Sequence, residues 1–363
     1  MRTNYLNLFR QLATVVLIAV TSGLVVGCSD DDTDPVSDEP SPKDSYKEIA
    51  KSTPLTFEAL EDGAQVVFAI HTKVNAAVQY STDSITWRDY TPLTPITLDK
   101  AGDKVMFRGN NETFSKYEGD VNMGNSNFIC TKDCYLYGNV MSLLDSLNYP
   151  NAVKLTGEHT FLGLFMKNTH LLNHPSIPIV LPATTLTKWC YNAMFHGCSK
   201  LTTAPELPAT TLAKGCYSGM FTDCTNLTEP PVLPATTLTV SCYANMFLGC
   251  TSLSYAPNLP ATTLTVSCYN LMFGGCTNLI YAPLLPAAKL EEESYWGMFG
   301  GCRNLKHITC LATDISAERS TQYWLSSVAS NGTFIKAAYM KKWQTNSNSG
   351  IPSGWEVKDY VER

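Results

Sequence analysis

Residues 207–224 read LPATTLAKGCYSGMFTDC, and the block returns 26 residues later as LPATTLTVSCYANMFLGC. No insertion interrupts this register over five copies, so the repeat organises the chain. The first part, Leu-Pro-Ala-Thr-Thr-Leu, begins at Leu181, Leu207, Leu233 and Leu259, with a degraded copy at Leu285. The second part, Cys-Tyr-x-x-Met-Phe-x-x-Cys, begins at Cys190, Cys216, Cys242 and Cys268, with a variant copy at Ser294.

A unit of this length cannot bury its own apolar face, but stacked units cover one another. Leu201–Leu207 is typical of a short extended segment, and Thr210–Cys216 of a second one. Tyr217–Cys224 is interpreted as a single helical turn, because its apolar residues have the spacing of one helical face. The pattern therefore predicts a mainly β solenoid with short helical turns.

The second part of the block resembles the Ile-Gly-x-x-Ala-Phe-x-x-Cys-x-x-Leu block of BspA-like leucine-rich-repeat proteins. The resemblance covers roughly Phe161–Ile315. It departs from the family in its longer period and in an Ala-Pro pair that interrupts the first extended segment. The resemblance implies a leucine-rich-repeat solenoid, a place on the bacterial surface, a role in adhesion, and a concave face lined by the first extended segments.

The entry to the repeats supports this interpretation. Leu164–Leu171 matches Met194–Leu201, with Asn168 in place of Cys198. Asn and Cys interchange at this position in leucine-rich repeats because both can donate a hydrogen bond inward to a neighbouring backbone. Residues 126–180 are therefore expected to form an N-terminal cap and an atypical first coil.

The exit is expected to close the stack. The leucine-rich repeats are predicted to occupy residues 181–316, followed by Glu318–Ala329 with helical patterning. The tail carries Trp343 and Trp355. Because the last coil would otherwise expose its core, residues 317–363 are expected to form a C-terminal cap.

Ahead of the repeats, residues 53–125 have a different pattern. Apolar residues recur in short runs such as Gln65–Ile70 and Ala77–Ser81, with turn residues between the runs. This spacing predicts a small antiparallel β-domain, sandwich-like in architecture.

The N-terminus predicts export and anchoring. Arg2 and Arg10 precede an apolar run, Leu12–Val26, which is too short and too polar at its end for a membrane span. It closes with VVGC at Cys28, which resembles the bacterial lipobox. Residues 1–27 are thus expected to be a lipoprotein signal peptide and Cys28 to be acylated, with outer-membrane lipid as its partner. The alternative is an ordinary secretory signal with an incidental cysteine.

The residues after Cys28 bear on location. Ser29–Asp34 reads SDDDTD, which resembles the acidic signal that carries lipoproteins of some Gram-negative anaerobes to the outer face. Residues 28–52 are rich in acid, Pro and Ser, so a disordered tether is expected. Together these features predict a lipid-anchored outer-membrane protein exposed on the cell surface.

The charge argues against a nucleic-acid partner. The formal net charge is -6, and removal of residues 1–27 would take away Arg2 and Arg10 and no acid, which leaves -8. Phosphate binding needs clustered Lys and Arg, and the sequence shows no such cluster.

Of the 13 cysteines, nine belong to the repeats. They form two columns: Cys190, Cys216, Cys242 and Cys268, and Cys198, Cys224, Cys250, Cys276 and Cys302. Their Cys-x7-Cys spacing, with no histidine in step, does not suit zinc. Export would permit disulfide bridges. In the fifth repeat, however, Ser294 stands in place of the cysteine of the first column, while Cys302 of the second column remains. This favours ladders of small buried residues. Cys130 with Cys134, and Cys302 with Cys310, remain the bridge candidates.

Nothing in the sequence has the form of a catalytic site. There is no nucleophile elbow, phosphate loop or paired-carboxylate signature, and the histidines recur at no repeat position. Glu291–Glu293 is interpreted as a solvated face rather than a calcium site. We expect no enzyme activity, cofactor or metal, with a hydrolase as the least favoured class.

Binding residues are expected at positions that the repeat leaves free. Exposed aromatic side chains there would suit a sugar ring or a protein partner. Alternatively, two of them, Tyr255 and Tyr281, pack on each other across coils. One such column contains Thr203, Glu229, Tyr255, Tyr281 and His307. A second column contains Glu206, Val232, Asn258 and Leu284.

Two functions follow from these features. The first is an adhesion or interaction module that binds host protein or matrix through the repeat face. The second is a glycan-binding lipoprotein of a surface polysaccharide-uptake system, with residues 53–125 as the domain that binds the glycan. Neighbouring genes for porin-type transporters and glycoside hydrolases would favour the second.

Overall fold

The computed structural model describes residues 42–116, 124–341, 343–346 and 348–361. Residues from Ser41 onward cluster as one compact unit. About 24% of the chain is strand and 5% helix, which confirms the mainly β prediction. The signal peptide, Cys28 and the acidic run after it lie outside the described residues.

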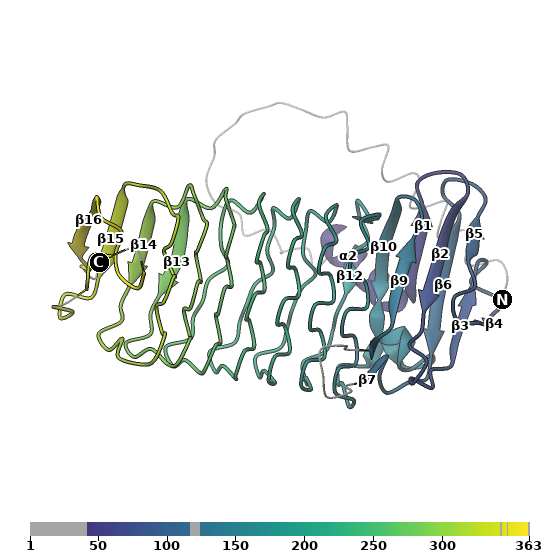
Figure 1. The fold of residues 1–363 in the computed structure, drawn as a ribbon. Coiled ribbons are helices and arrows are strands. Elements are labelled where there is room, and N and C mark those ends of the chain that lie inside the picture. The colour runs from purple at the N-terminus through teal and green to yellow at the C-terminus, as the bar shows by residue number, and fades with distance from the viewer. Residues whose placement is uncertain (1–41, 117–123, 342, 347, 362–363) are drawn as a thin grey trace, which may run out of the picture. The chain divides into compact units, whose positions relative to one another are not determined.

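Two sheets pack face to face at the N-terminal end of this unit (Figure 1). The larger runs in the order β11-β10-β1-β6-β3-β4, with β12 also paired to β10, and the smaller in the order β5-β2-β9. The strands of the larger sheet are β1 (Leu55–Ala59), β3 (Val78–Ser81), β4 (Arg88–Asp89), β6 (Lys104–Gly109), β10 (Cys134–Asn139), β11 (Leu171–Asn173) and β12 (Ile179–Val180). Those of the smaller are β2 (Ala64–Ala69), β5 (Ile96–Leu98) and β9 (Asn127–Cys130), while β7 (Ser115–Lys116) and β8 (Gly124–Asn125) pair separately.

Aromatic rings from both sheets fill the space between them. Burial alternates along β2 and β6, as expected for strands with one face on a core. Phe57 of β1 lies 4.9 Å from Phe128 of β9, measured between ring centroids. Phe68 of β2 stacks on Phe128 at 3.9 Å.

Strand β10 joins this sandwich to the coils. It pairs antiparallel with β1, with Thr56 opposite Tyr137, and parallel with β11, with Cys134 opposite Leu171. The larger sheet therefore runs across the domain boundary expected at residue 125. β10 therefore belongs both to the antiparallel sandwich and to the first parallel strand pair of the coils.

The disordered tether predicted through residue 52 is wrong over its last part. Pro42–Ser52 forms the helix α2, which contacts β10 and β12, and Ala50 is fully buried. The Asn139 side chain donates to the Lys51 carbonyl at 3.0 Å, and the Tyr149 hydroxyl donates to the Ser52 carbonyl at 2.5 Å. These bonds satisfy carbonyls that a helix end leaves open. The composition of the segment gives no sign of these distant partners.

From residue 155 onward the chain runs in successive coils that hydrogen-bond to one another. The Tyr217 amide donates to the Cys242 carbonyl at 3.1 Å, one coil ahead. The Met220 amide instead donates to the Tyr217 carbonyl at 3.3 Å, three residues back. Amide groups alternate in this way along residues 216–224, so each second one links two coils.

The predicted helical turn in each repeat is therefore wrong. Residues 216–224 form overlapping β-turns, and every fourth residue has positive φ: 60° at Gly215, 61° at Gly219 and 57° at Asp223. Glu318–Ala329, also expected to be helical, repeats this geometry with positive φ at Arg319. Helices of the described residues are α2 and two short 3-10 segments, η1 (Val140–Leu143) and η2 (Tyr149–Asn151).

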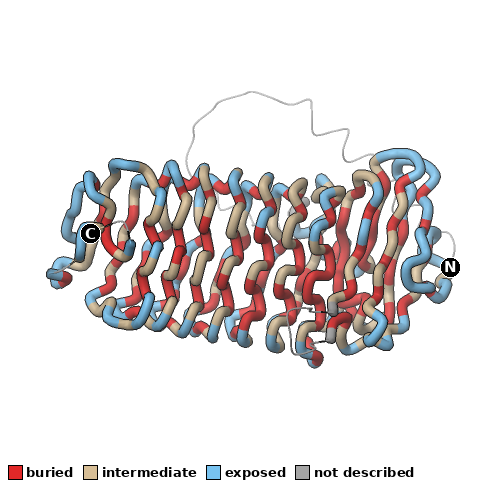
Figure 2. Tube along the Cα trace, viewed as in Figure 1, coloured by how far each residue is buried: buried red, intermediate tan, exposed pale blue. Residues whose placement is uncertain are grey.

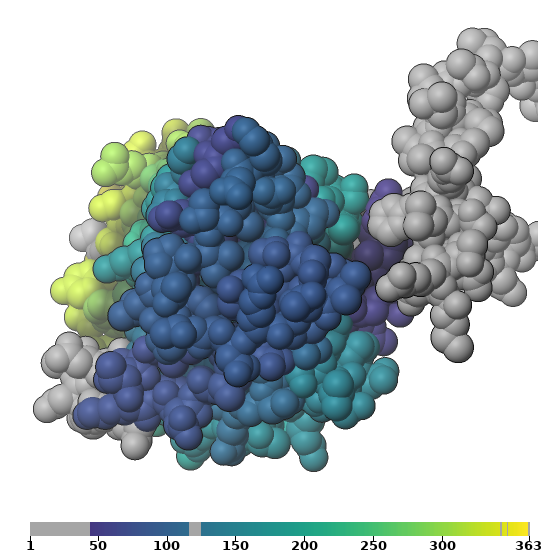
Figure 3. Space-filling view, turned by 90° about the vertical axis from the view of Figure 1, so that its right-hand side faces the viewer, coloured from purple at the N-terminus to yellow at the C-terminus, as the bar shows by residue number. Residues whose placement is uncertain are grey.

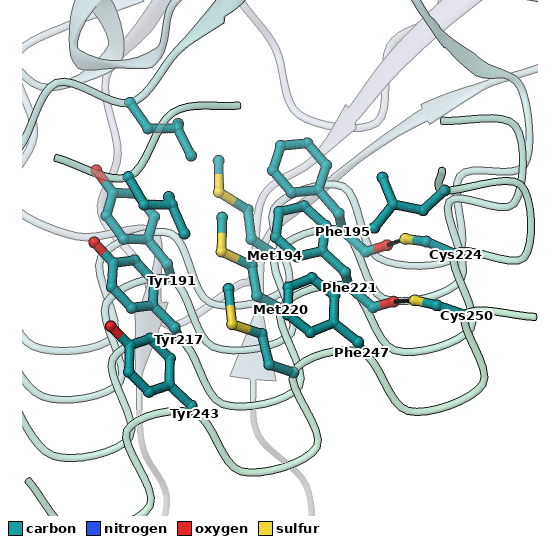
Figure 4. Close-up of a cluster of buried hydrophobic side chains, with 14 of the residues drawn as sticks. Tyr191, Met194, Phe195, Tyr217, Met220, Phe221, Cys224, Tyr243, Phe247 and Cys250 are labelled. Atoms are coloured by element: carbon teal, nitrogen blue, oxygen red, sulfur yellow. Dashed lines mark hydrogen bonds between the residues drawn. The ribbon is translucent and has the colours of Figure 1, made fainter. Parts of the chain in front are cut away.

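The apolar side chains expected on one face are nonetheless all buried, because the turns also direct them inward. They stack between coils in columns, with ring centroids 5.9 Å apart for Tyr191 and Tyr217, and 5.6 Å for Phe195 and Phe221 (Figure 4). Buried residues recur in every coil (Figure 2). Phe165 stacks on Phe128 at 5.9 Å, so the phenylalanine column continues into the sandwich.

The C-terminal end is a parallel sheet in the order β13-β14-β15-β16. Trp324 stacks on Tyr295 at 6.3 Å and on Trp343 at 5.3 Å, and so covers the end of the tyrosine column. The Trp355 indole donates to the Ala329 carbonyl at 2.8 Å. The strands are β13 (Tyr281–Leu285), β14 (His307–Cys310), β15 (Gly332–Lys336) and β16 (Trp355–Asp359).

Candidate functional site

One cysteine column is a hydrogen-bond ladder. The Cys224 thiol donates to the Phe195 carbonyl of the preceding coil at 3.1 Å (Figure 4). The other four members repeat this bond at 3.0 or 3.1 Å. In the first coil the Asn168 amide donates to the Phe128 carbonyl at 3.1 Å. The predicted exchange of Asn for Cys is therefore confirmed.

The described cysteines are all buried free thiols, including the bridge candidates Cys130 with Cys134 and Cys302 with Cys310. Burial raises the pKa of the Cys190 thiol to about 12, so the thiolate does not form at neutral pH. The thiols of the ladder therefore pack in the core and donate hydrogen bonds.

The five residues proposed for binding lie on successive coils. We call Thr203, Glu229, Tyr255, Tyr281 and His307 the strip. Its two tyrosines project outward, with exposed fractions of 52% and 61%. At one end Thr203 and Glu229 form a parallel bridge, and the Thr203 hydroxyl donates to the Glu229 carboxylate at 3.3 Å. At the other end Tyr281 is opposite His307 in the β13–β14 pair.

The ring contacts within the strip differ from the alternative considered above. Tyr281 stacks on His307, with centroids 4.5 Å apart and planes at 10°. Across the described part of the chain no ring contact involves Tyr255. Its ring therefore stays open to a ligand, while His307 holds one face of Tyr281.

A bulge in β13 brings the second column onto the same face. Tyr281 pairs with His307 and Leu284 with Thr309, so the segment Tyr281–Leu284 contains one residue more than its partner. In a regular strand residues 281 and 284 would point to opposite faces. Here both are exposed and Pro283 between them is buried.

The other coils repeat this burial pattern. Pro257 is buried and Asn258 exposed, as Pro205 is buried and Glu206 exposed. The proline of the Ala-Pro pair is thus buried in these coils, and the residue after it is exposed. The sequence pattern showed the pair but did not predict this exposure.

The second column adds apolar surface beside the strip. Val232 is 78% exposed and Leu284 is 45% exposed. Val232 borders a hollow of about 260 Å³, whose walls also include Glu206 and Pro234. Lys47 of α2 pairs with Glu206 at 2.7 Å, so α2 lies at the beginning of this column.

The backbone of the Tyr255 coil is open on this face. The Ala204 amide donates to the Glu229 carbonyl at 2.9 Å, and the Lys306 amide to the Ile280 carbonyl at 3.0 Å. For residues 254–259, all of them described, the structure contains no backbone hydrogen bond to a neighbouring coil. This stretch therefore does not link its coil to either neighbour through the backbone.

Two groups of charged side chains elsewhere form ion pairs. Arg319 lies 3.0 Å from Glu293 and 3.5 Å from Glu292. Asp133 accepts from Lys200 at 2.7 Å and from His170 at 2.9 Å. Partial burial opposes ionisation of Asp133, but these two partners outweigh it and hold its pKa below the usual range.

Over the described ranges the structure shows no cluster of metal-ligating side chains and no helix long and apolar enough to cross a bilayer. What it does present is a repeated outward column of aromatic and polar side chains beside an apolar one. Comparisons with family models, with curated proteins and with solved structures find no match to this chain.

Proposed function

We propose that this chain is a lipid-anchored surface module whose leucine-rich-repeat solenoid binds a protein partner through the strip and the column beside it. The observation that carries the proposal is the exposure of large apolar side chains on neighbouring coils. Tyr255, Tyr281, Val232 and Leu284 all belong to this set.

The solenoid class rests on the stacking of equivalent residues. Amide–carbonyl bonds such as Tyr217 to Cys242 link each coil to the next, and equivalent bonds recur every 26 residues. The aromatic columns repeat at the same interval, and the tyrosine column ends against Trp324. Repeat proteins gain their stability from such nearest-neighbour contacts and need covered ends. The resemblance to BspA-like proteins supports the same class.

A protein partner suits the chemistry of this face. Soluble proteins seldom expose neighbouring apolar side chains without a use for them. Interface centres are rich in tyrosine and poor in charge, with polar residues at the rim. Tyr255 and Tyr281 would form such a centre, and Glu229 and His307 lie on the coils to either side.

The anchor and the location rest on sequence features. The lipobox-like VVGC ending at Cys28 and the acidic run after it support acylation and display on the outer membrane. Cys28→Ala should abolish palmitate labelling and release the protein from the membrane fraction. A variant that still labels and sediments with outer membranes would contradict the anchor.

The binding test uses a double variant, Tyr255→Ala with Tyr281→Ala, against immobilised host matrix proteins. Removal of interface aromatics commonly costs about 2 kcal/mol or more, so we expect roughly a thirtyfold loss of affinity. Tyr339→Ala is the matched control, because Tyr339 is 89% exposed and lies outside the strip. Undiminished binding by a folded double variant, or no matrix binding by the wild type, would count against the proposal.

A further inference from the structure

A second surface, on the edge of the sandwich, also has the form of a binding site. Two hollows of about 370 and 330 Å³ open there and share Asp89 and Tyr90 as walls. Figure 3 views the molecule from this end. Each hollow has the volume of a small-molecule site, and both border Asp89 of β4.

Hydroxyl groups line the first hollow. Tyr80, Thr82, Thr91, Thr94 and Thr97 contribute to its walls, together with the charged pair Arg88 and Asp89. A wall of this kind offers many neutral donors and acceptors and only one charge of each sign. It suits a polar, uncharged ligand with several hydroxyl groups.

A chain of hydrogen bonds positions the side chains between the hollows. Gln79 of β3 donates to Asp89 of β4 at 3.0 Å, and Arg108 of β6 donates through Nε to Gln79 at 3.0 Å. The three residues are cross-strand neighbours in register. No hydrogen bond from the described residues reaches Asp89 Oδ2 or the terminal N–H groups of Arg108. The chain therefore holds these groups in place and leaves them to a ligand.

An aromatic ring and a rigid loop complete the surface. The Arg108 guanidinium lies 4.1 Å from the centre of the Trp87 ring, which holds the indole against a cross-strand neighbour of Gln79. The loop before Trp87 is held by Asp83, whose carboxylate accepts from the Thr86 amide at 2.6 Å and from the Ile85 amide at 2.8 Å. These bonds keep the pKa of Asp83 well below its usual range, so the carboxylate stays ionised and continues to accept both amides at neutral pH.

We infer that the hollows around Asp89 bind a saccharide, with Gln79 and Asp89 in their walls and the neighbouring Trp87–Arg108 pair as further recognising residues. Each sugar hydroxyl both donates and accepts, which matches a carboxylate, an amide and a guanidinium in one row. The C–H face of a sugar ring is apolar and suits an indole. A phosphate or another simple anion fits poorly, because the Asp89 carboxylate borders both hollows and would repel it. The site shares no residue with the strip, so it stands independently of the proposed function.

The test measures binding of the purified full chain to a glycan array, followed by calorimetry with the best-retained oligosaccharide. We expect Trp87→Ala to weaken binding at least thirtyfold and Asp89→Asn at least tenfold. Ile85→Ala is the matched control, because this side chain is 83% exposed in the same loop and is not one of the proposed recognising residues. Asp89→Asn replaces an exposed side chain of equal size, so it tests the site even where Trp87→Ala unfolds the chain.

The double variant of the strip separates the two proposals. Tyr255→Ala with Tyr281→Ala should retain full saccharide binding while it loses the protein partner. Loss of saccharide binding in that variant would place the sugar on the strip and overturn this inference. Retention by both Trp87→Ala and Asp89→Asn, or retention of no saccharide by the wild type, would overturn it as well.

Discussion

Replacement of Phe247 by Ala tests the stacked core most directly. The side chain is fully buried in a middle coil. Its ring lies between Phe221 at 5.8 Å and Phe273 at 5.6 Å, nearly parallel to both. Its carbonyl accepts the Cys276 thiol at 3.1 Å. Phe247→Ala would remove two ring contacts and leave a cavity between adjacent coils.

The expected cost follows from these contacts. Burial of a phenylalanine side chain contributes about 1.5–3 kcal/mol, and each aromatic pair adds about 0.5–1.5 kcal/mol. Truncations of this kind generally cost about 3–5 kcal/mol, and we expect a value near the middle of that range. At an m-value of about 3 kcal/mol/M, a 4 kcal/mol loss lowers the urea midpoint by roughly 1.3 M.

Urea unfolding and hydrogen exchange would measure this effect. Because each coil is coupled only to its neighbours, exchange should rise most around residues 221–273 and should separate the unfolding of the two flanks. Tyr255→Ala is the control, since its exposed side chain should matter by less than about 0.5 kcal/mol. An unchanged midpoint for Phe247→Ala would refute the coil register described above.

Three further outcomes follow from the buried columns. Tyr217→Phe should keep or raise stability, by up to about 1–3 kcal/mol, because its buried hydroxyl has no partner and Phe161 already occupies the equivalent position; a lower urea midpoint would contradict this. When the denatured, unreduced chain is alkylated, its mass should show that most repeat cysteines are modified; protection of most of them would show that they form disulfide bridges. Burial raises the pKa of Cys190, Cys268 and Cys302 from 9.0 to about 12. Their stabilising effect is complete below pH 9 and is lost as pH rises toward 12, by about 1.4 kcal/mol per pH unit for each thiol. Urea midpoints should therefore fall above pH 9, and a flat profile from pH 8 to pH 10.5 would contradict the burial.

The strict interval made the inward positions predictable. A residue that recurs every 26 positions must occupy the same environment in each coil, so the buried tyrosines, phenylalanines and cysteines followed from the repeat. The exchange of Asn168 for Cys198 was predictable for the same reason. Both side chains donate to a backbone carbonyl at that position.

The backbone between those positions was not predictable from spacing alone. Tyr217, Met220, Phe221 and Cys224 would face inward on a helix, and they also face inward in a run of β-turns. The two differ in where the amides donate, and the partners here lie on the next coil. Likewise the segment ending at Ser52 folds as α2 because Asn139 and Tyr149 bind its last carbonyls.

Sequence by itself therefore determined the period, the mainly β class and the residues that the core contains, because these depend on patterns within one repeat. Tertiary structure decided which polar and apolar residues share a surface. Gln79, Asp89 and Arg108 meet because three strands lie in register. Tyr281 and Leu284 share a face because the partner strand is one residue shorter at Pro283. Such neighbours are set by hydrogen bonds between distant strands, and no local pattern records them.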